Sequence, residues 1–389
     1  MNAKLLRRAL FLTCMSVASF AAPSTVVAEQ VAPRAVVAKA APKVQIAILL
    51  DTSSSMDGLI RQAKSELWSI VNRFSEASHG GVVPTIEVAL FEYGKDSIPA
   101  DEGYLRMITP LTTDLDEVSE ELFALSTNGG SEFAGLAIER SVQGLQWSKS
   151  SSDYRVIFIA GNEPFTQGPM SYTKAISQAG GSGIIVNTIH CGSAKDGVKG
   201  KWQHAAKIGE GDFLNIEQNH RVQEIATPFD KEIATLSIKV NGTYIAYGAG
   251  GSKKAERQRA QDANASSMGA ASMAKRAKTK GGHAYKNSSW DLVDSMDEDE
   301  AALDDVKTND LPKVMQSMNK AERKKFVAKK AAERKGLQDK IKALSAKREK
   351  FIAAERKKKA DKDNTSTFDR AMLKTVDKQM KRKGYRFKK

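Results

Sequence analysis

Cysteine is nearly absent from the sequence, since only Cys14 and Cys191 occur among 389 residues. Cys14 falls inside a predicted signal peptide, so the mature chain keeps one cysteine and cannot form an internal disulfide. Long apolar runs are missing as well, because the run at Leu10–Phe20 is too short to span a bilayer. The fold must therefore depend on a hydrophobic core, and 41% of the residues are hydrophobic.

Catalytic motifs are missing too. The sequence contains no Gly-x-Ser-x-Gly, no His-Glu-x-x-His and no phosphate-binding glycine loop. His190-Cys191 and the other histidines match no zinc spacing, and Cys191 is best interpreted as a buried small residue. We therefore expect a binding protein and not an enzyme. A metal-assisted hydrolase that uses Asp51 or Glu163 is the remaining catalytic alternative.

The first 28 residues have the organisation of a secretory signal peptide. Three basic residues precede the apolar run, and a small-residue cleavage site follows at Val26–Ala28. Residues 29–43 are rich in proline and alanine and are predicted to form a linker. We expect an exported protein, periplasmic or secreted, that is not transmembrane once the signal is removed. A retained membrane anchor is the alternative.

Charge is divided unevenly along the chain. Residues 44–235 contain 15 Lys and Arg against 25 Asp and Glu, whereas residues 236–389 contain 39 against 20. The protein is therefore an acidic body followed by a basic tail. Such a tail can meet an anionic surface or fold back on the acidic body. Nucleic acid is a poor expectation for an exported protein.

Strand and helix patterns alternate between residues 44 and 235. Continuous apolar runs, typical of strands covered on both faces, are separated by segments with helical spacing and by a helix cap at Thr113 or Asp114. This order predicts an α/β fold with a doubly wound, mostly parallel sheet and helices on both faces. The expected strands are residues 44–50, 85–91, 104–108, 155–160, 183–190 and 213–216, and the expected helices are residues 57–78, 133–147, 172–178, 202–208 and 222–236.

The second half of the chain is predicted to lie outside the sheet. Asn241-Gly242 stands between alternating runs, which indicates a hairpin or a single exit strand over residues 236–252. Residues 253–318 are rich in Gly, Ala, Ser and Lys around an acidic block, so we expect a low-complexity linker. Residues 319–389 resemble a basic helical or coiled-coil-like tail. Its imperfect heptads leave a fold-back helix and a dimeric coiled coil both open.

The stretch Asp51-Thr52-Ser53-Ser54-Ser55 directly follows the first expected strand. Ligands of doubly wound sheets gather at the carboxyl ends of strands, near a switch in strand order. A carboxylate and alternate hydroxyls at that place offer hard oxygen ligands with little charge, which suit Mg²⁺ better than Zn²⁺. In a simpler interpretation, Asp51 caps the helix that begins near Asp57 and the serines bond loop amides.

This pattern resembles the metal-ion-dependent adhesion site of von Willebrand factor type A (vWA) domains. That family combines Asp-x-Ser-x-Ser after the first strand, a Thr in a later glycine-rich turn, and an Asp after another buried strand. The stretches "AGNEPFTQGP" and "VNTIHCG" also resemble exported bacterial proteins with vWA domains. The resemblance covers residues 44–235 and implies a doubly wound fold, while the basic extension lies outside it.

The resemblance also implies ligands for Mg²⁺, or for Mn²⁺ or Ca²⁺. Ser53 and Ser55 would bind the ion directly, and Asp51 would act mainly through water. Ser131, in the turn after Gly129-Gly130, corresponds to the family's Thr, with Thr127 as the fallback. Either residue keeps a hydroxyl group at the site.

The third element departs from the family pattern, because Gly161-Asn162 stands where the family has its Asp. Asn162 would offer its amide oxygen, and Glu163 would reach the ion through a water molecule. Losing the Asp lowers the negative charge of the site and weakens its expected affinity for the ion.

The resemblance implies recognition without turnover, in which a carboxylate of a partner protein completes the coordination of the ion. We expect an exported protein that binds such a partner, while residues 319–389 add electrostatic contact with an anionic envelope surface. The alternative is a metal-independent scaffold that its basic tail attaches to the envelope or to an anionic polymer. The candidate metal site consists of Asp51, Ser53, Ser55, Ser131, Asn162 and Glu163.

Overall fold

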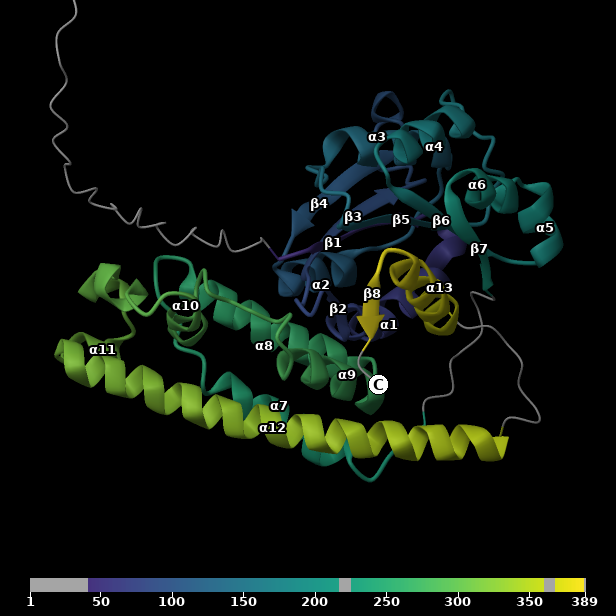
Figure 1. Ribbon diagram of the computed structural model, residues 1–389. Helices are drawn as coiled ribbons and strands as arrows, with labels where there is room; N and C mark the ends of the chain where they lie inside the picture. The colour runs from purple at the N-terminus through teal and green to yellow at the C-terminus, as the bar shows by residue number, and fades with distance from the viewer. Residues whose placement is uncertain (1–40, 217–224, 360–367, 388–389) are drawn as a thin grey trace, which may run out of the picture. The chain divides into compact units, whose positions relative to one another are not determined.

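The computed structural model describes residues 41–216, 225–359 and 368–387 (Figure 1). The expected signal peptide, residues 1–28, and the linker as far as residue 40 lie outside these ranges, as does the start of the helix expected over residues 222–236. Among the helices within the ranges, none combines the length and apolar character needed to cross a bilayer.

A six-stranded sheet forms the centre of the structure, in the order β4-β3-β1-β5-β6-β7. All neighbours are parallel except β3 and β4, so the predicted mostly parallel α/β fold is confirmed. The chain passes from β1 to β3 on one side and later to β5 on the other, so the end of β1 lies at a switch in strand order. The strands are β1 (Lys43–Asp51), β3 (Thr85–Tyr93), β4 (Leu105–Thr112), β5 (Tyr154–Gly161), β6 (Ile185–Cys191) and β7 (Glu210–Ile216).

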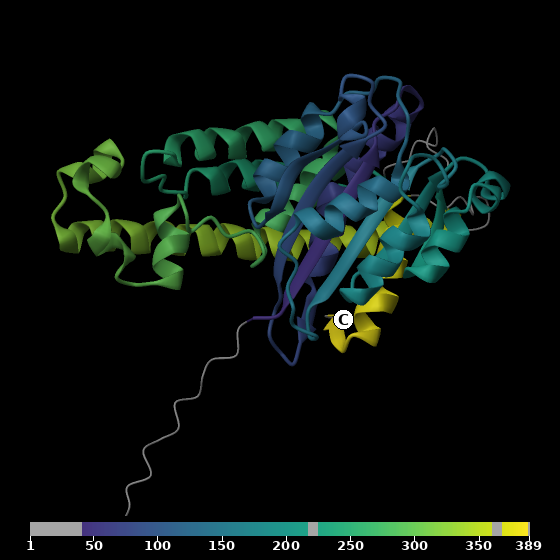
Figure 2. The ribbon, with the colours of Figure 1, turned by 90° about the horizontal axis from the view of Figure 1, so that it is seen from above.

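Apolar side chains fill both faces of the sheet. One core cluster joins the sheet to α1, α2 and α13, and a second joins it to α3, α4 and α6 (Figure 2). Of the two predicted caps, Asp114 begins α2 by accepting a hydrogen bond from the amide of Glu117 at 3.1 Å. The helices are α1 (Asp57–Ser75), α2 (Leu115–Ala124), α3 (Ala134–Gly144), α4 (Tyr172–Gly181), α5 (Ala194–Lys199), α6 (Trp202–Ile208) and α13 (Phe368–Arg382).

The hairpin or exit strand expected over residues 236–252 is wrong. Residues Asp230–Asn241 form helix α7, and Gly242 follows it as the C-cap. Ile233, Leu236 and Val240 are buried on one side of this helix, with the spacing of a helical stripe. Asn-Gly therefore ends a helix here and does not turn a hairpin.

The low-complexity linker expected over residues 253–318 is also wrong, because this segment folds into helices. They are α8 (Gly251–Ser267), α9 (Ala270–Lys280), α10 (Leu292–Glu298) and the short α11 (Lys313–Gln316). Small buried residues such as Ala265, Ala274 and Ala277 let these helices approach their neighbours closely. Helix α9 packs against both α1 and α7, so the segment belongs to the folded body.

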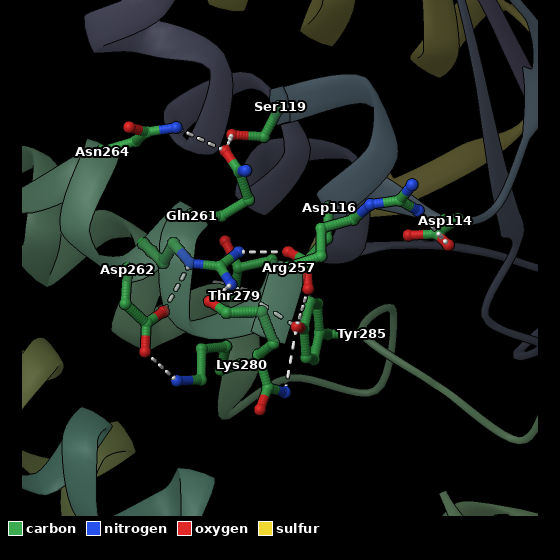
Figure 3. Close-up of polar contacts among 12 residues, drawn as sticks. Asp114, Asp116, Ser119, Arg257, Gln261, Asp262, Asn264, Thr279, Lys280 and Tyr285 are labelled. Atoms are coloured by element: carbon green, nitrogen blue, oxygen red, sulfur yellow. Dashed lines mark hydrogen bonds and ion pairs between the residues drawn. The ribbon is translucent and has the colours of Figure 1, made fainter. Parts of the chain in front are cut away.

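A buried polar network attaches α8 and α9 to α2 (Figure 3). Arg276, which is fully buried, forms ion pairs of 2.7 Å with Asp116 and with Asp262. Lys280 reaches the other oxygen of Asp262 at 2.7 Å, and Tyr285 donates a hydrogen bond to Asp116. Burial lowers the pKa of Lys280 to about 8, against the attraction of Asp262.

The basic tail is helical, as expected, and it packs on its own chain. Helix α12 (Lys320–Lys359) lies against α7, α9 and α10. Helix α13 packs on α1 and on β7, and the last strand, β8 (Tyr385–Phe387), pairs antiparallel with β2 (Ala77–His79). The end of the tail is therefore part of the sheet domain, although residues 44–235 were expected to form that domain alone.

Candidate metal site

The Asp51-Ser55 loop leaves the sheet at the end of β1. Asp51 is fully buried, and its Oδ1 accepts a hydrogen bond from the amide of Ser53 at 2.8 Å, which turns the chain sharply. Ser53 and Ser55 then lie together, with their hydroxyl oxygens 3.4 Å apart. Thr52 points away, toward Glu92 and the carbonyl of Tyr93, each 3.3 Å from its hydroxyl. The side chains of Ser53 and Ser55 therefore lie on one side of the loop and that of Thr52 on another, as the alternate spacing of the sequence predicts.

Two glycines make room for the carboxyl group of Asp51. A Cβ atom on Gly94 would lie 2.9 Å from Oδ1 of Asp51, and one on Gly161 would lie 2.9 Å from Oδ2. Tyr93 also limits the space at Gly161, because a Cβ atom on Gly161 would lie 2.5 Å from the hydroxyl of Tyr93. The structure therefore has no space for a side chain at the place where the vWA pattern has its Asp.

Glu132 is a site residue that sequence reasoning missed. A Cβ atom on Gly94 would lie 2.8 Å from its Cγ, so Glu132 and Asp51 border the same small space. The side chain is 9% exposed and also interacts with the hydroxyl of Ser53. Its position next to Ser131 in the glycine-rich turn could have indicated a site residue. The resemblance to the vWA pattern pointed only to the hydroxyl group of Ser131.

Burial and neighbouring negative charges both disfavour the ionised form of the carboxyl groups at this site. Burial raises the pKa of Asp51 to about 7, and nearby Glu132 adds to the rise, while hydrogen bonds from Ser53 counteract it. Burial likewise raises the pKa of Glu132, where Ser53 again counteracts the rise and Glu163 and Asp96 add to it. The carboxyl ends of these strands and the adjoining loops thus concentrate more negative charge than their surroundings compensate.

Two buried oxygens of the site have no hydrogen-bond partner. They are Oδ2 of Asp51 and Oδ1 of Asn162. The amide oxygen can only accept a hydrogen bond, and the carboxyl oxygen can only accept one once Asp51 is ionised. Buried acceptors are normally paired, so each of these oxygens requires a physical reason. A cation bound beside them would supply it.

The remaining expected ligands are placed less closely. Glu163 accepts a hydrogen bond of 3.3 Å from Gln167 and lies near enough to Glu132 to raise its pKa. Ser131 is half-buried and precedes Glu132 in the chain. The fallback residue, Thr127, donates its hydroxyl to Asp57 on α1 and is thereby drawn away from Asp51.

His190 and Cys191 support the fold of this edge of the sheet. The ring of His190 lies 3.0 Å from Oδ1 of Asn215 and 3.3 Å from the carbonyl of Asn162, so it supports the loop behind the site. Cys191 is buried, and burial raises the pKa of its thiol, which disfavours a thiolate nucleophile.

Comparison with known proteins agrees with this geometry. Residues 45–212 match the family model of the von Willebrand factor type A domain. Residues 45–212 are therefore identified as a vWA domain. Domains of this family commonly mediate adhesion between proteins. No curated protein matches the sequence.

Several solved structures with vWA folds are similar to the chain. The SpRpn10 VWA domain is 12% identical, with a TM-score of 0.36 over 48% of this chain and 100% of that one. A von Willebrand factor type A structure from Catenulispora acidiphila is 16% identical, with a TM-score of 0.33 over 45% and 39%. The mussel byssus proximal thread matrix protein 1 is 14% identical, with a TM-score of 0.34 over 45% and 42%, so the chain spans less than half of that protein. At these identities and scores the similarity has no bearing on function.

The vWA domain offers a donor set that fits a hard divalent cation. Asp51 and Ser53 offer carboxylate and hydroxyl oxygens at the end of β1, and Asn162, whose backbone amide interacts with Asp51, adds a buried amide oxygen. Across the described ranges, no three His, Cys, Asp or Glu side chains are arranged to hold an ion by themselves. Any ion at this site must therefore also use hydroxyl or amide ligands, as Mg²⁺ does more readily than Zn²⁺.

Proposed function

We propose that this vWA protein is exported and binds a partner protein through a divalent-cation site, with Mg²⁺ as the expected ion and Mn²⁺ or Ca²⁺ as substitutes. The observation that supports this most is the unpaired buried oxygen of Asp51, whose carboxyl group borders the same small space as Glu132; a second unpaired buried oxygen belongs to Asn162. The proposed role is recognition, and we assign no catalytic residue.

In this proposal the ion supplies a positive charge that a carboxylate of the partner can coordinate. The chain's own groups hold the site in shape. The amide of Ser53 fixes Asp51, Ser53 and Ser55 present their hydroxyls together, and Glu132 contributes the carboxylate for which Gly161 leaves no space. Asn162 has a buried amide oxygen without a partner, and the ring of His190 lies 3.3 Å from its backbone carbonyl.

Calorimetric titration of Mg²⁺ and Mn²⁺ into the wild type, Ser53→Ala/Ser55→Ala and Glu132→Gln tests the proposal. We expect binding to the wild type and a loss of at least about tenfold in both variants, because each removes oxygen ligands. Thr127→Val serves as the matched control, since Thr127 bonds Asp57 and should not affect the ion. Equal affinity in all four proteins, or no binding to any, would contradict the proposal.

The second candidate function is a scaffold that needs no metal and attaches to an anionic surface by its basic tail. The closed space at Gly161 favours it, because the family's acid cannot stand there. A pull-down of partner proteins with and without EDTA separates the two candidates. Capture that EDTA abolishes supports the cation site, whereas capture that EDTA leaves unchanged supports the scaffold.

A further inference from the structure

Helix α12 has two faces of different composition. On the face toward the body, Arg334 forms ion pairs of 2.7 Å with Asp291 and 2.8 Å with Asp294, and Arg348 pairs with Asp230 at 2.8 Å. These arginines are almost completely buried, next to the apolar contacts of the same face. The acidic groups of the body that α12 meets are therefore already used by its inner side.

The outer face of α12 is lined mainly with lysines and small residues, with the acidic Glu322 and Asp339 at its two edges. In a projection down the helix axis, with about 100° of rotation per residue, six exposed lysines fall within an arc of about 100°. The described part of the chain provides none of them with an ion pair, and it pairs the nearby acids Glu333 and Asp339 with other lysines. We call these six residues the outer lysine face: Lys325, Lys329, Lys340, Lys347, Lys350 and Lys357.

The chemistry of this face favours a flat, hydrated anionic surface. Lysine is a strongly hydrated point charge, unlike the forked arginines used inside, so the face lacks geometric selectivity. Between the lysines lie Ala332, Gly336, Ala343 and Ala354, which offer no apolar side chain for insertion and no aromatic ring for base stacking.

The length of the helix points the same way. Helix α12 is a single long helix of 40 residues, about 60 Å in length (Figure 1). The six lysines extend from Lys325 to Lys357, with irregular intervals between them. A flat anionic surface can contact all six lysines at once, whatever the distances between them. The phosphates of a nucleic-acid duplex have a fixed spacing, so they can contact a straight helix only where the lysines have the same spacing.

We propose that the outer lysine face of α12 docks on the surface of a lipid bilayer rich in anionic headgroups. The contact is electrostatic and reversible, and it is independent of the cation site. Each lysine close to such a surface contributes about fivefold to binding, and salt weakens the contact.

Sedimentation with vesicles tests this proposal on the full chain in EDTA. One set of vesicles contains phosphatidylcholine alone, and the other contains phosphatidylcholine with about one third phosphatidylglycerol. The difference between the two sets isolates the electrostatic part from any salt-insensitive insertion of the apolar run at Leu10–Phe20. We expect binding to the anionic vesicles that is lost when salt is raised from about 0.05 M to 0.5 M.

Two quadruple variants identify the surface. The face variant is Lys325→Gln/Lys329→Gln/Lys347→Gln/Lys350→Gln, and the control is Lys174→Gln/Lys195→Gln/Lys199→Gln/Lys207→Gln, which removes equal charge from exposed lysines on α4, α5 and α6. We expect at least a tenfold loss for the face variant and less than threefold for the control. Equal losses, binding that ignores lipid charge, or binding to a soluble polyanion but not to vesicles would overturn the proposal.

Discussion

Asp51 is an ionisable group held in a fully buried position, with one oxygen hydrogen-bonded and the other unpaired. In the absence of an ion, the protein reduces the cost of this arrangement by raising the pKa of the carboxyl group to about 7. The protonation state of Asp51 therefore links pH, cation binding and stability through a single side chain.

Replacing Asp51 with Asn should make the ion-free protein more stable than the wild type above pH 7. The pKa of Asp51 is higher in the folded chain than in the unfolded chain, so its stabilising contribution is present below pH 4 and is lost as pH rises through about 7. We expect the gap between the proteins to open over that window, reaching about 2–4 kcal/mol. Urea unfolding in EDTA at several pH values measures it.

Added Mg²⁺ should reverse this difference above pH 7, because it stabilises only the protein with a carboxylate at position 51. Stability curves of Asp51→Asn and the wild type that stay parallel with pH would show that Asp51 is not the titrating group.

Gly161→Ala should destabilise the protein, because the new Cβ would meet the hydroxyl of Tyr93 at 2.5 Å and Oδ2 of Asp51 at 2.9 Å. We expect a loss of about 1–3 kcal/mol from overpacking. Tyr93→Phe in the same chain removes the closer contact, so the double variant should lose less than the sum of the single losses. Strict additivity in thermal unfolding would show that the two residues do not collide.

The sequence predicted some site residues better than others, for physical reasons. Ser53 and Ser55 follow a strand with an obvious apolar pattern, so their position follows from the strand. Glu132 lies in an irregular turn, and neither its burial nor its proximity to Asp51 follows from spacing alone. Which residues of the candidate metal site bind an ion stays a prediction: Asp51, Ser53, Ser55, Ser131, Asn162 and Glu163.

Helix α13 is the element whose importance is least evident from the sequence. Its Gln379 is fully buried and connects two strands, accepting a hydrogen bond of 2.7 Å from the hydroxyl of Tyr154 and exchanging bonds of 2.7 and 3.2 Å with Asn187. A surface helix carrying many lysines thus supplies a central polar contact of the sheet.

Gln379→Ala should cost about 2–4 kcal/mol of unfolding free energy, because it leaves the buried polar groups of Tyr154 and Asn187 without their partner. The neighbouring substitution Lys378→Ala removes only an ion pair with Asp212 from a lysine side chain that is 58% exposed. It should cost less than about 1 kcal/mol. Chemical denaturation of both variants decides the matter, and similar losses would refute a special role for Gln379.

Elements with a single dominant pattern were predicted well, and elements with two compatible patterns were not. The continuous apolar runs that form β1 and β5 are consistent only with buried strands. Residues 236–240 fit both the strand and the helix pattern. Leu236, Ile238 and Val240 alternate as in a strand, and Leu236 and Val240 also continue a helical stripe that starts at Ile233. The helix prevails because its stripe meets α9, and Ile238 is left 63% exposed. The pairing of β2 with β8 joins chain segments too far apart for any local signal.

At the scale of the whole molecule, the network around Arg276 makes the helical extension and the vWA domain interdependent. Arg276 stacks on Trp68 of α1, 4.5 Å from the ring centre, while it pairs with Asp116 of α2 and Asp262 of α8. The charge division of the sequence indicated either an external partner or a fold-back contact with the acidic body, and Arg348 of α12 supplies such a contact by pairing with Asp230.

Arg276→Met should therefore destabilise the protein by about 3–5 kcal/mol, because it leaves the buried carboxyl groups of Asp116 and Asp262 poorly compensated. In calorimetry we expect a single unfolding transition for the wild type and a broadened or divided one for the variant. Arg257→Ala is the control, since its ion pairs with Asp114 and Glu120 are partly exposed and each contributes less than about 1 kcal/mol. A sharp, unshifted transition in Arg276→Met would show that the network does not connect the two parts.

The pairing of β8 with the sheet domain brings the two ends of the folded body together. The hydroxyl of Tyr385 lies 3.2 Å from the carbonyl of Lys43, where β1 begins, and Asp51 stands at the other end of that strand, about 26 Å away. A short peptide could thus join residues 387 and 41 in a circular permutant without crossing the candidate metal site. New termini could then be opened in an exposed loop, which would allow reporter groups to be placed at a chosen distance from Asp51.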